Sequence, residues 1–243
     1  MVMKRVILSL LLMISAISFA QIDKSMVATE DNLQNISRSA SIVMTTDMDE
    51  LYEGIRGTPY LFTGWRQGNI YLKDSSQIKN INIKYNIYTD DVLYLNSKSG
   101  DSLIIERSLI REFQMLNDSA SNIITFKEMN MKPGNDGKST FVKVLYDSKS
   151  EFLMKYIKVF IKADYKGAYT AGRKYDEYTD DLQYYILKDN NELNKIKLGK
   201  KAVIKVLAEK ENKIKSFIDQ QGLTLDNEND VIKVLDYYDS ITD

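Results

Sequence analysis

Neither cysteine nor histidine occurs among the 243 residues of this chain. Without cysteine no disulfide supports the fold, and a chain of this length buries enough surface to be stable without one. The chain also lacks the base and the thiol of Ser-His-Asp and Cys-His mechanisms. Because imidazole and thiolate ligands are absent and no complete calcium loop is present, we expect no metal site and no cofactor. The remaining chemistry is that of carboxylates, lysine and tyrosine.

A second long apolar run is missing as well. The one such run spans residues 6–19, follows Lys4 and Arg5, and ends with the small residues Ser18 and Ala20 before a polar segment. It is shorter than the ~20 residues that cross a bilayer, and it fits a cleaved secretory signal. We therefore expect residues 1–20 to be a signal peptide. We also expect an exported protein, periplasmic or secreted, with no transmembrane segment after cleavage.

An excess of charge of one sign is also absent. The chain has 33 basic and 34 acidic side chains, and removal of Lys4 and Arg5 with the signal peptide leaves 31 and 34, a net charge of −3. Proteins that bind nucleic acids concentrate positive charge, so we expect no nucleic-acid partner.

The rest of the chain divides by pattern. Residues 21–56 are mixed and polar, and predict a poorly ordered lead-in. Residues 57–198 contain short runs of alternating polarity, such as Ile81, Ile83 and Tyr85 against Asn80 and Asn82, separated by turn residues. This period indicates antiparallel strands, and the short spacings leave no room for crossover helices. We expect a β meander or half-barrel of about eight or nine strands.

The longest predicted strand covers residues 151–163. Its lysines Lys155 and Lys158 lie three apart and break the strict alternation. A β-bulge near Tyr156 and Ile157 would restore the phase and curl the sheet.

Residues 199–243 change to a helical period. Val203, Leu207, Ile214, Phe217 and Ile218 form one apolar stripe, which Gly222 ends; Asp226 or Asn227 then caps a second helix. The chain is therefore expected to have an α+β fold, in which a C-terminal pair of amphipathic helices packs on the sheet.

Several segments resemble an uncharacterised group of exported, periplasmic or secreted proteins of Bacteroidota-type bacteria. They read GTPYL at 57–61, GNIYL at 68–72 and IKYNIYTD at 83–90, followed by KADY at 162–165, GRKYD at 172–176 and YY at 237–238. The resemblance covers roughly residues 57–243, and Thr58 stands where the group favours serine. It implies an exported protein of this fold, and the group has no established activity.

The candidate binding site is a tyrosine-rich stretch near the end of the strand region. It contains Tyr165, Tyr169, Arg173, Tyr175 and Tyr178. Tyrosine rings stack on sugars or grip peptides, and the charged residues add hydrogen bonds. The alternative is a long loop whose rings pack against its own sheet. On the first interpretation the protein is a non-enzymatic binding module, and its partner is an envelope protein or a glycan.

A different class of function, a carboxylate-dependent hydrolase acting on a glycan, is the alternative. Acidic pairs occur at Asp90 and Asp91, at Asp176 and Glu177, and at 180–181. Neighbouring residues of a strand point to opposite faces, so two distant pairs would have to meet across a cleft, about 5–10 Å apart.

Overall fold

The computed structural model describes residues 44–45, 54–117, 122–131, 139–164 and 174–242. The predicted signal peptide and most of the predicted lead-in lie outside these residues. The elements in chain order are β1 (Met44–Thr45), β2 (Arg66–Leu72), β3 (Gln77–Asn86), β4 (Asp91–Leu95), β5 (Ser102–Ile105), η3 (Arg107–Leu109), β6 (Ile110–Leu116), β7 (Ile123–Asn130), β8 (Ser139–Asp147), β9 (Glu151–Ile161), β10 (Glu177–Leu187), β11 (Leu193–Ile196), α3 (Lys200–Val206), η4 (Ala208–Lys210), α4 (Glu211–Gln220) and α5 (Glu228–Ile241).

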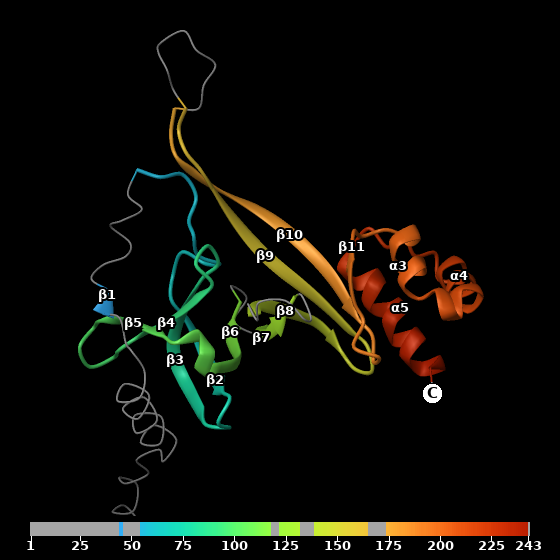
Figure 1. Ribbon diagram of the computed structural model, residues 1–243, viewed down its shortest axis with the longest axis horizontal. Helices are drawn as coiled ribbons and strands as arrows, with labels where there is room; N and C mark the ends of the chain where they lie inside the picture. The colour runs from blue at the N-terminus through green and yellow to red at the C-terminus, as the bar shows by residue number, and fades with distance from the viewer. Residues whose placement is uncertain (1–43, 46–53, 118–121, 132–138, 165–173, 243) are drawn as a thin grey trace, which may run out of the picture.

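The eleven strands of the described residues form one sheet, in the order β1-β5-β4-β3-β2-β6-β7-β8-β9-β10-β11. Every neighbouring pair is antiparallel, and helices follow the last strand. The predicted α+β class, an antiparallel meander followed by helices, is therefore confirmed. Figure 1 shows the strands β2 to β8 grouped together and the three α-helices at the base of the long β9–β10 hairpin, where β9 begins and β10 ends.

The first part of the sheet is curled. β5 ends at Ile105 and β6 begins at Ile110, yet β4, β3 and β2 lie between them in the sheet. In a flat sheet four strand spacings need about 19 Å. The connection reaches at most about 18 Å when fully extended, and part of it is coiled in η3. The sheet must therefore bend so that β5 approaches β6, as the half-barrel prediction requires.

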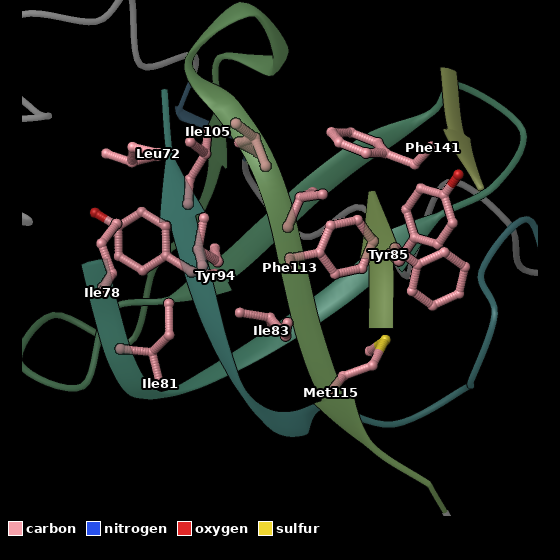
Figure 2. Close-up of a cluster of buried hydrophobic side chains, with 14 of the residues drawn as sticks. Leu72, Ile78, Ile81, Ile83, Tyr85, Tyr94, Ile105, Phe113, Met115 and Phe141 are labelled. Atoms are coloured by element: carbon pink, nitrogen blue, oxygen red, sulfur yellow. The ribbon is translucent and has the colours of Figure 1, made fainter. Parts of the chain in front are cut away.

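The buried side chains inside this curl form a hydrophobic core, called here the sheet cluster. Its rings pack closely: Phe113 stacks on Phe126 with centroids 4.8 Å apart, and Tyr85 meets the edge of Phe113 at 5.2 Å. Figure 2 shows the side chains converging from neighbouring strands. The sheet cluster consists of Ile70, Leu72, Ile78, Ile81, Ile83, Tyr85, Ile87, Val92, Tyr94, Leu103, Ile105, Ile110, Phe113, Met115, Ile124, Phe126 and Phe141.

Gly68 is required where β2 crosses this cluster. A Cβ there would lie 2.2 Å from the carbonyl oxygen of Gln114 on β6 and 2.6 Å from Cδ1 of Ile83 on β3. The register of β2 against β3 shifts at this position. A glycine in a strand often marks such a bulge with a close neighbour, which is the case here.

The outer face of β3 is covered by the segment before β2. Lys84 points away from the sheet cluster, as the alternation predicts, yet its side chain is only 3% exposed. Its Nζ lies 4.1 Å from the ring centroid of Tyr60 and 5.7 Å from that of Trp65. The ammonium is thus held over two aromatic faces. Trp65, directly before β2, thus lies over the outer face of β3.

The β9–β10 hairpin is the longest strand pair, and it has no register shift over eleven residues on each side. The bulge predicted near Tyr156 and Ile157 is therefore wrong. The shift occurs in β8 instead, between Val144 and Tyr146. β8 and β9 are paired only as far as Met154, so the later residues of β9 need not keep the phase of β8.

A second core, the helix cluster, joins the base of this hairpin to the helices. The predicted apolar stripe is divided into α3 and α4 by η4, so three α-helices replace the expected two. Gly222 follows α4 with φ 62°, as predicted, and Asn227 caps α5 by accepting a bond from the Asp230 amide at 3.0 Å. The helix cluster consists of Phe152, Ile186, Ile196, Val203, Leu207, Ile214, Ile218, Leu223, Leu225, Val231, Val234, Leu235 and Tyr238.

Candidate functional site

A cavity of about 430 Å³ lies where β8 and β9 part. Beyond Met154, β9 pairs only with β10, while the start of β8 pairs only with β7. The two strands therefore separate and leave a wedge beside the β3–β4 turn and η3. The volume is within the range of small-molecule sites, about 300–1,000 Å³. Its lining consists of Tyr85, Ile87, Tyr88, Thr89, Asp90, Arg107, Met131, Ser139, Thr140, Lys155, Tyr156, Ile157 and Lys158.

Asp90 organises one wall of the cavity. It ends the β3–β4 turn with φ 65°, a conformation that aspartate tolerates better than most residues. Its Oδ1 accepts bonds from the Tyr85 hydroxyl at 2.7 Å and from the Phe141 amide at 3.4 Å, and its Oδ2 lies 2.7 Å from the Arg107 guanidinium. One carboxylate thus joins β3, β8 and η3.

The opposite wall is the middle of β9. Lys155 and Lys158 both line the cavity although they lie on opposite faces of the strand. This is possible because the cavity lies along the edge of β9 that β8 leaves. The side chain of Lys158 is 8% exposed and its Nζ lies 2.6 Å from Asp180 on β10, whose carboxylate is 67% exposed.

Two tyrosines supply hydroxyl groups to the same space. Burial and the neighbouring Asp90 raise the pKa of Tyr85 well above its usual value. Burial also raises the pKa of Tyr156, and the charges of Glu228 and Asp180 add to the effect. Both phenols are therefore protonated at neutral pH, and the O–H of Tyr85 is the one that donates to Asp90.

An aromatic group adjoins the cavity. Tyr88 lines the cavity and is 49% exposed. Its ring centroid lies 5.3 Å from that of Tyr178 on β10 and 6.4 Å from that of Phe160 on β9. Phe160 and Tyr178 are cross-strand partners, with centroids 5.0 Å apart. Phe160 lies on the face of β9 that carries Tyr156 and Lys158, so these rings, called here the aromatic platform, continue one wall of the cavity.

The chain before β2 holds this end of the hairpin. The Arg56 amide donates to the Asp176 carbonyl, and the Tyr178 amide donates to the Arg56 carbonyl at 2.8 Å. Gly57 permits the approach, because it has φ 77° and a Cβ there would lie 2.7 Å from the Tyr178 carbonyl oxygen. The Arg56 guanidinium also lies 3.4 Å from the ring centroid of Tyr175. The backbone of Tyr178 is thus held by Arg56 on one side and by its cross-strand partner Phe160 on the other.

The structure places part of the site predicted from sequence. Tyr165, Tyr169 and Arg173 lie outside the described residues. Tyr178 belongs to the aromatic platform, and Tyr175 lies next to it under a guanidinium from the preceding segment. The structure thus locates Tyr175 and Tyr178, and a binding role for either residue stays a prediction.

Sequence reasoning missed the cavity itself. Arg107 lies on η3 and the lysines Lys155 and Lys158 lie on β9, far away in the sequence, so only the fold brings them together. A signal existed in the spacing of Lys155 and Lys158, which was interpreted as a bulge. Two lysines three apart on a strand point to opposite faces, and both can reach a cavity that lies along the free edge of that strand.

The acidic pairs do not form a two-carboxylate site in this cavity. Asp90 is the one carboxylate among its described lining residues, and both of its oxygens are engaged. A hydrolase that needs two facing carboxylates gains no support here. Within the described residues, no three acidic side chains lie close enough together to hold a metal ion.

Comparison with protein-family models, with curated proteins and with solved structures finds no match to this chain. The resemblance based on segments such as GTPYL therefore stays an expectation. Over the part of the chain that is described, no helix has the length and apolar character needed to cross a membrane.

Proposed function

We propose that the protein is a non-enzymatic binding module that holds a saccharide in the cavity between β8 and β9. The observation that carries this proposal is the continuity of the cavity with the aromatic platform of Tyr88, Phe160 and Tyr178. Sugars have apolar ring faces and polar edges. An exposed aromatic ring beside a cavity with hydroxyl and ammonium donors matches both features.

The walls of the cavity favour binding over catalysis. Asp90 accepts hydrogen bonds from two groups and pairs with a cation, so its role is to hold Tyr85 and Arg107 in place. Groups fixed in this way form a preformed site, which lowers the entropy cost of binding.

Export belongs to the same proposal. Its support is the signal-like sequence of residues 1–20, and an envelope glycan is then the natural ligand class. The mass of the protein isolated from its native cell tests this point. Cleavage predicts a mature chain that begins at Gln21, and an intact N-terminus in the isolated protein would contradict export by this route.

The binding test uses a panel of immobilised neutral and acidic oligosaccharides, followed by calorimetry on any that bind. Tyr88→Ala removes the most exposed platform ring and should weaken binding about tenfold, or about 1.4 kcal/mol. Ile123→Ala is the control, because Ile123 is 61% exposed and lies outside the cavity lining. Its affinity should stay unchanged. Absence of binding to every panel member, or equal affinities for Tyr88→Ala and the wild type, would refute the proposal.

A further inference from the structure

The cavity lining carries more positive than negative charge. Three of its described residues are cations, Arg107, Lys155 and Lys158, against the single carboxylate of Asp90. The side chain of Lys158 is 8% exposed, and its partner Asp180 is 67% exposed and lies outside the lining. Water screens such an exposed carboxylate, so it balances the buried ammonium only in part. Cations thus outnumber carboxylates among the described lining residues.

The donors on the two walls have capacity for an anion. The Arg107 guanidinium has five N–H donors in a planar fork, and the contact with Asp90 joins one of its terminal nitrogens. An ammonium such as that of Lys158 has three donors, of which the contact with Asp180 needs one. Charge-assisted hydrogen bonds to a carboxylate or a sulfate are about twice as strong as neutral ones.

The phenols of Tyr85 and Tyr156 add no negative charge to the cavity. Burial keeps the pKa of each above its usual value. Neither can therefore supply a negative charge that would compete with an anionic ligand at neutral pH. The Tyr85 O–H already donates to Asp90, so one wall offers the Arg107 guanidinium, and the other offers the cations of β9 and the Tyr156 hydroxyl.

From this charge balance and geometry we propose that the saccharide bound in the cavity is acidic. Its anionic group lies between Arg107 on η3 and the two lysines of β9, while its ring packs beside Tyr88. This inference rests on the proposed function and names the class of sugar that the same site binds. The shared chemistry is a sugar with an anionic substituent, and both carboxylated and sulfated sugars meet it.

The test compares three probes by calorimetry with the full chain: an oligogalacturonate, its methyl ester, and a sulfated galactose oligosaccharide. The acid and its ester differ in charge and share the same ring. We expect the oligogalacturonate or the sulfated probe to bind at least tenfold more tightly than the ester. The preference should shrink as the salt concentration rises, because salt screens the charges. Which anionic probe binds more tightly identifies the substituent.

Two charge variants separate local from long-range effects. Lys155→Gln with Lys158→Gln removes both cations of β9 and should abolish the preference. Lys195→Gln with Lys197→Gln is the matched control, since both lysines are exposed and outside the cavity lining, Lys195 on β11 and Lys197 directly after it. It changes the net charge equally and should leave the preference intact. The fluorescence of Trp65 on denaturation checks that each variant folds.

The outcomes separate this inference from the proposed function. Equal affinities for the acid, the sulfated probe and the ester would overturn the inference and leave saccharide binding standing. Equal loss of preference in both charge variants would also overturn it, because net charge would then be the cause. Absence of binding to every probe and to the wider panel would overturn both proposals. For the wild type, the salt dependence tests the inference even if the Lys155 and Lys158 variant fails to fold.

Discussion

The sheet cluster and the helix cluster are built differently. The sheet cluster takes residues from strands far apart in sequence and contains four packed rings, those of Tyr85, Phe113, Phe126 and Phe141. The helix cluster is mainly aliphatic and takes most of its residues from α3, α4 and α5, which follow one another directly. The first cluster depends on strand register, whereas the second depends on local helical periodicity.

The β9–β10 hairpin connects the two clusters, and the candidate site lies along it. At its base, Phe152 belongs to the helix cluster and stacks on Tyr184 with ring centroids 5.7 Å apart. In its middle, Tyr156 packs on the sheet cluster and lines the cavity. Towards its far end, Phe160 belongs to the aromatic platform. The cavity therefore lies at the boundary between the two cores, along the part of β9 that runs from the helix cluster past the sheet cluster.

The largest effect is expected in the sheet cluster. Phe113→Ala removes a fully buried ring that contacts three other aromatic side chains, and should lower the free energy of unfolding by about 3–5 kcal/mol. Urea denaturation followed by two probes measures it. Fluorescence of Trp65, the one tryptophan, reports the first region, and the helical circular dichroism reports the second. Since one sheet joins the clusters, both curves should move together.

A truncation in the helix cluster is the matched comparison. Leu235→Ala removes a fully buried aliphatic side chain of α5 and should cost about 2–5 kcal/mol. If either substitution shifted one probe and left the other in place, the two clusters would be separate folding units. The statement that the hairpin couples them would then be wrong.

The polar contact that joins α5 to the β8 end of the sheet is the next to be tested. Asp239 on α5 is 6% exposed, and its Oδ2 accepts bonds from the Tyr146 hydroxyl and the Ser150 amide, both at 3.0 Å. Asp239→Ala leaves these two donors without their partner and should cost about 2–3 kcal/mol in urea denaturation. Asp239→Asn keeps an acceptor oxygen and should cost less. Equal losses in the two variants would show that the lost charge, and not the lost acceptor, is responsible.

Much of the fold follows from sequence because its signals are local. The alternation around Ile81 and Ile83 marks a strand, and the stripe from Val203 to Ile218 marks helical structure. The break at η4 was not predicted, since Val203 and Leu207 on one side and Ile214 and Ile218 on the other share one periodic stripe. Periodicity alone does not tell a continuous helix from two helices that bury the same face.

The candidate site follows from sequence much less well. Tyr178 lies in a tyrosine-rich stretch that the sequence singles out, whereas Tyr88 and Arg107 are isolated residues in unrelated segments. Their meeting depends on the curl that brings β5 beside β6 and on the parting of β8 from β9. Both are long-range properties of the sheet, set by register and not by any local pattern.

The smallest expected effect lies at the start of α5 and tests the local character of the helix cluster. Asn227→Ala removes the side-chain oxygen that accepts from the Asp230 amide, and such caps contribute about 1 kcal/mol. Asn227→Ser, the control, keeps an accepting oxygen and should remain within a few tenths of a kcal/mol of the wild type. Because the cap is local, the saccharide affinity of the cavity should not change. A parallel loss of affinity in Asn227→Ala would mean that the start of α5 supports the cavity through Glu228, which accepts a bond from the Tyr184 hydroxyl on β10.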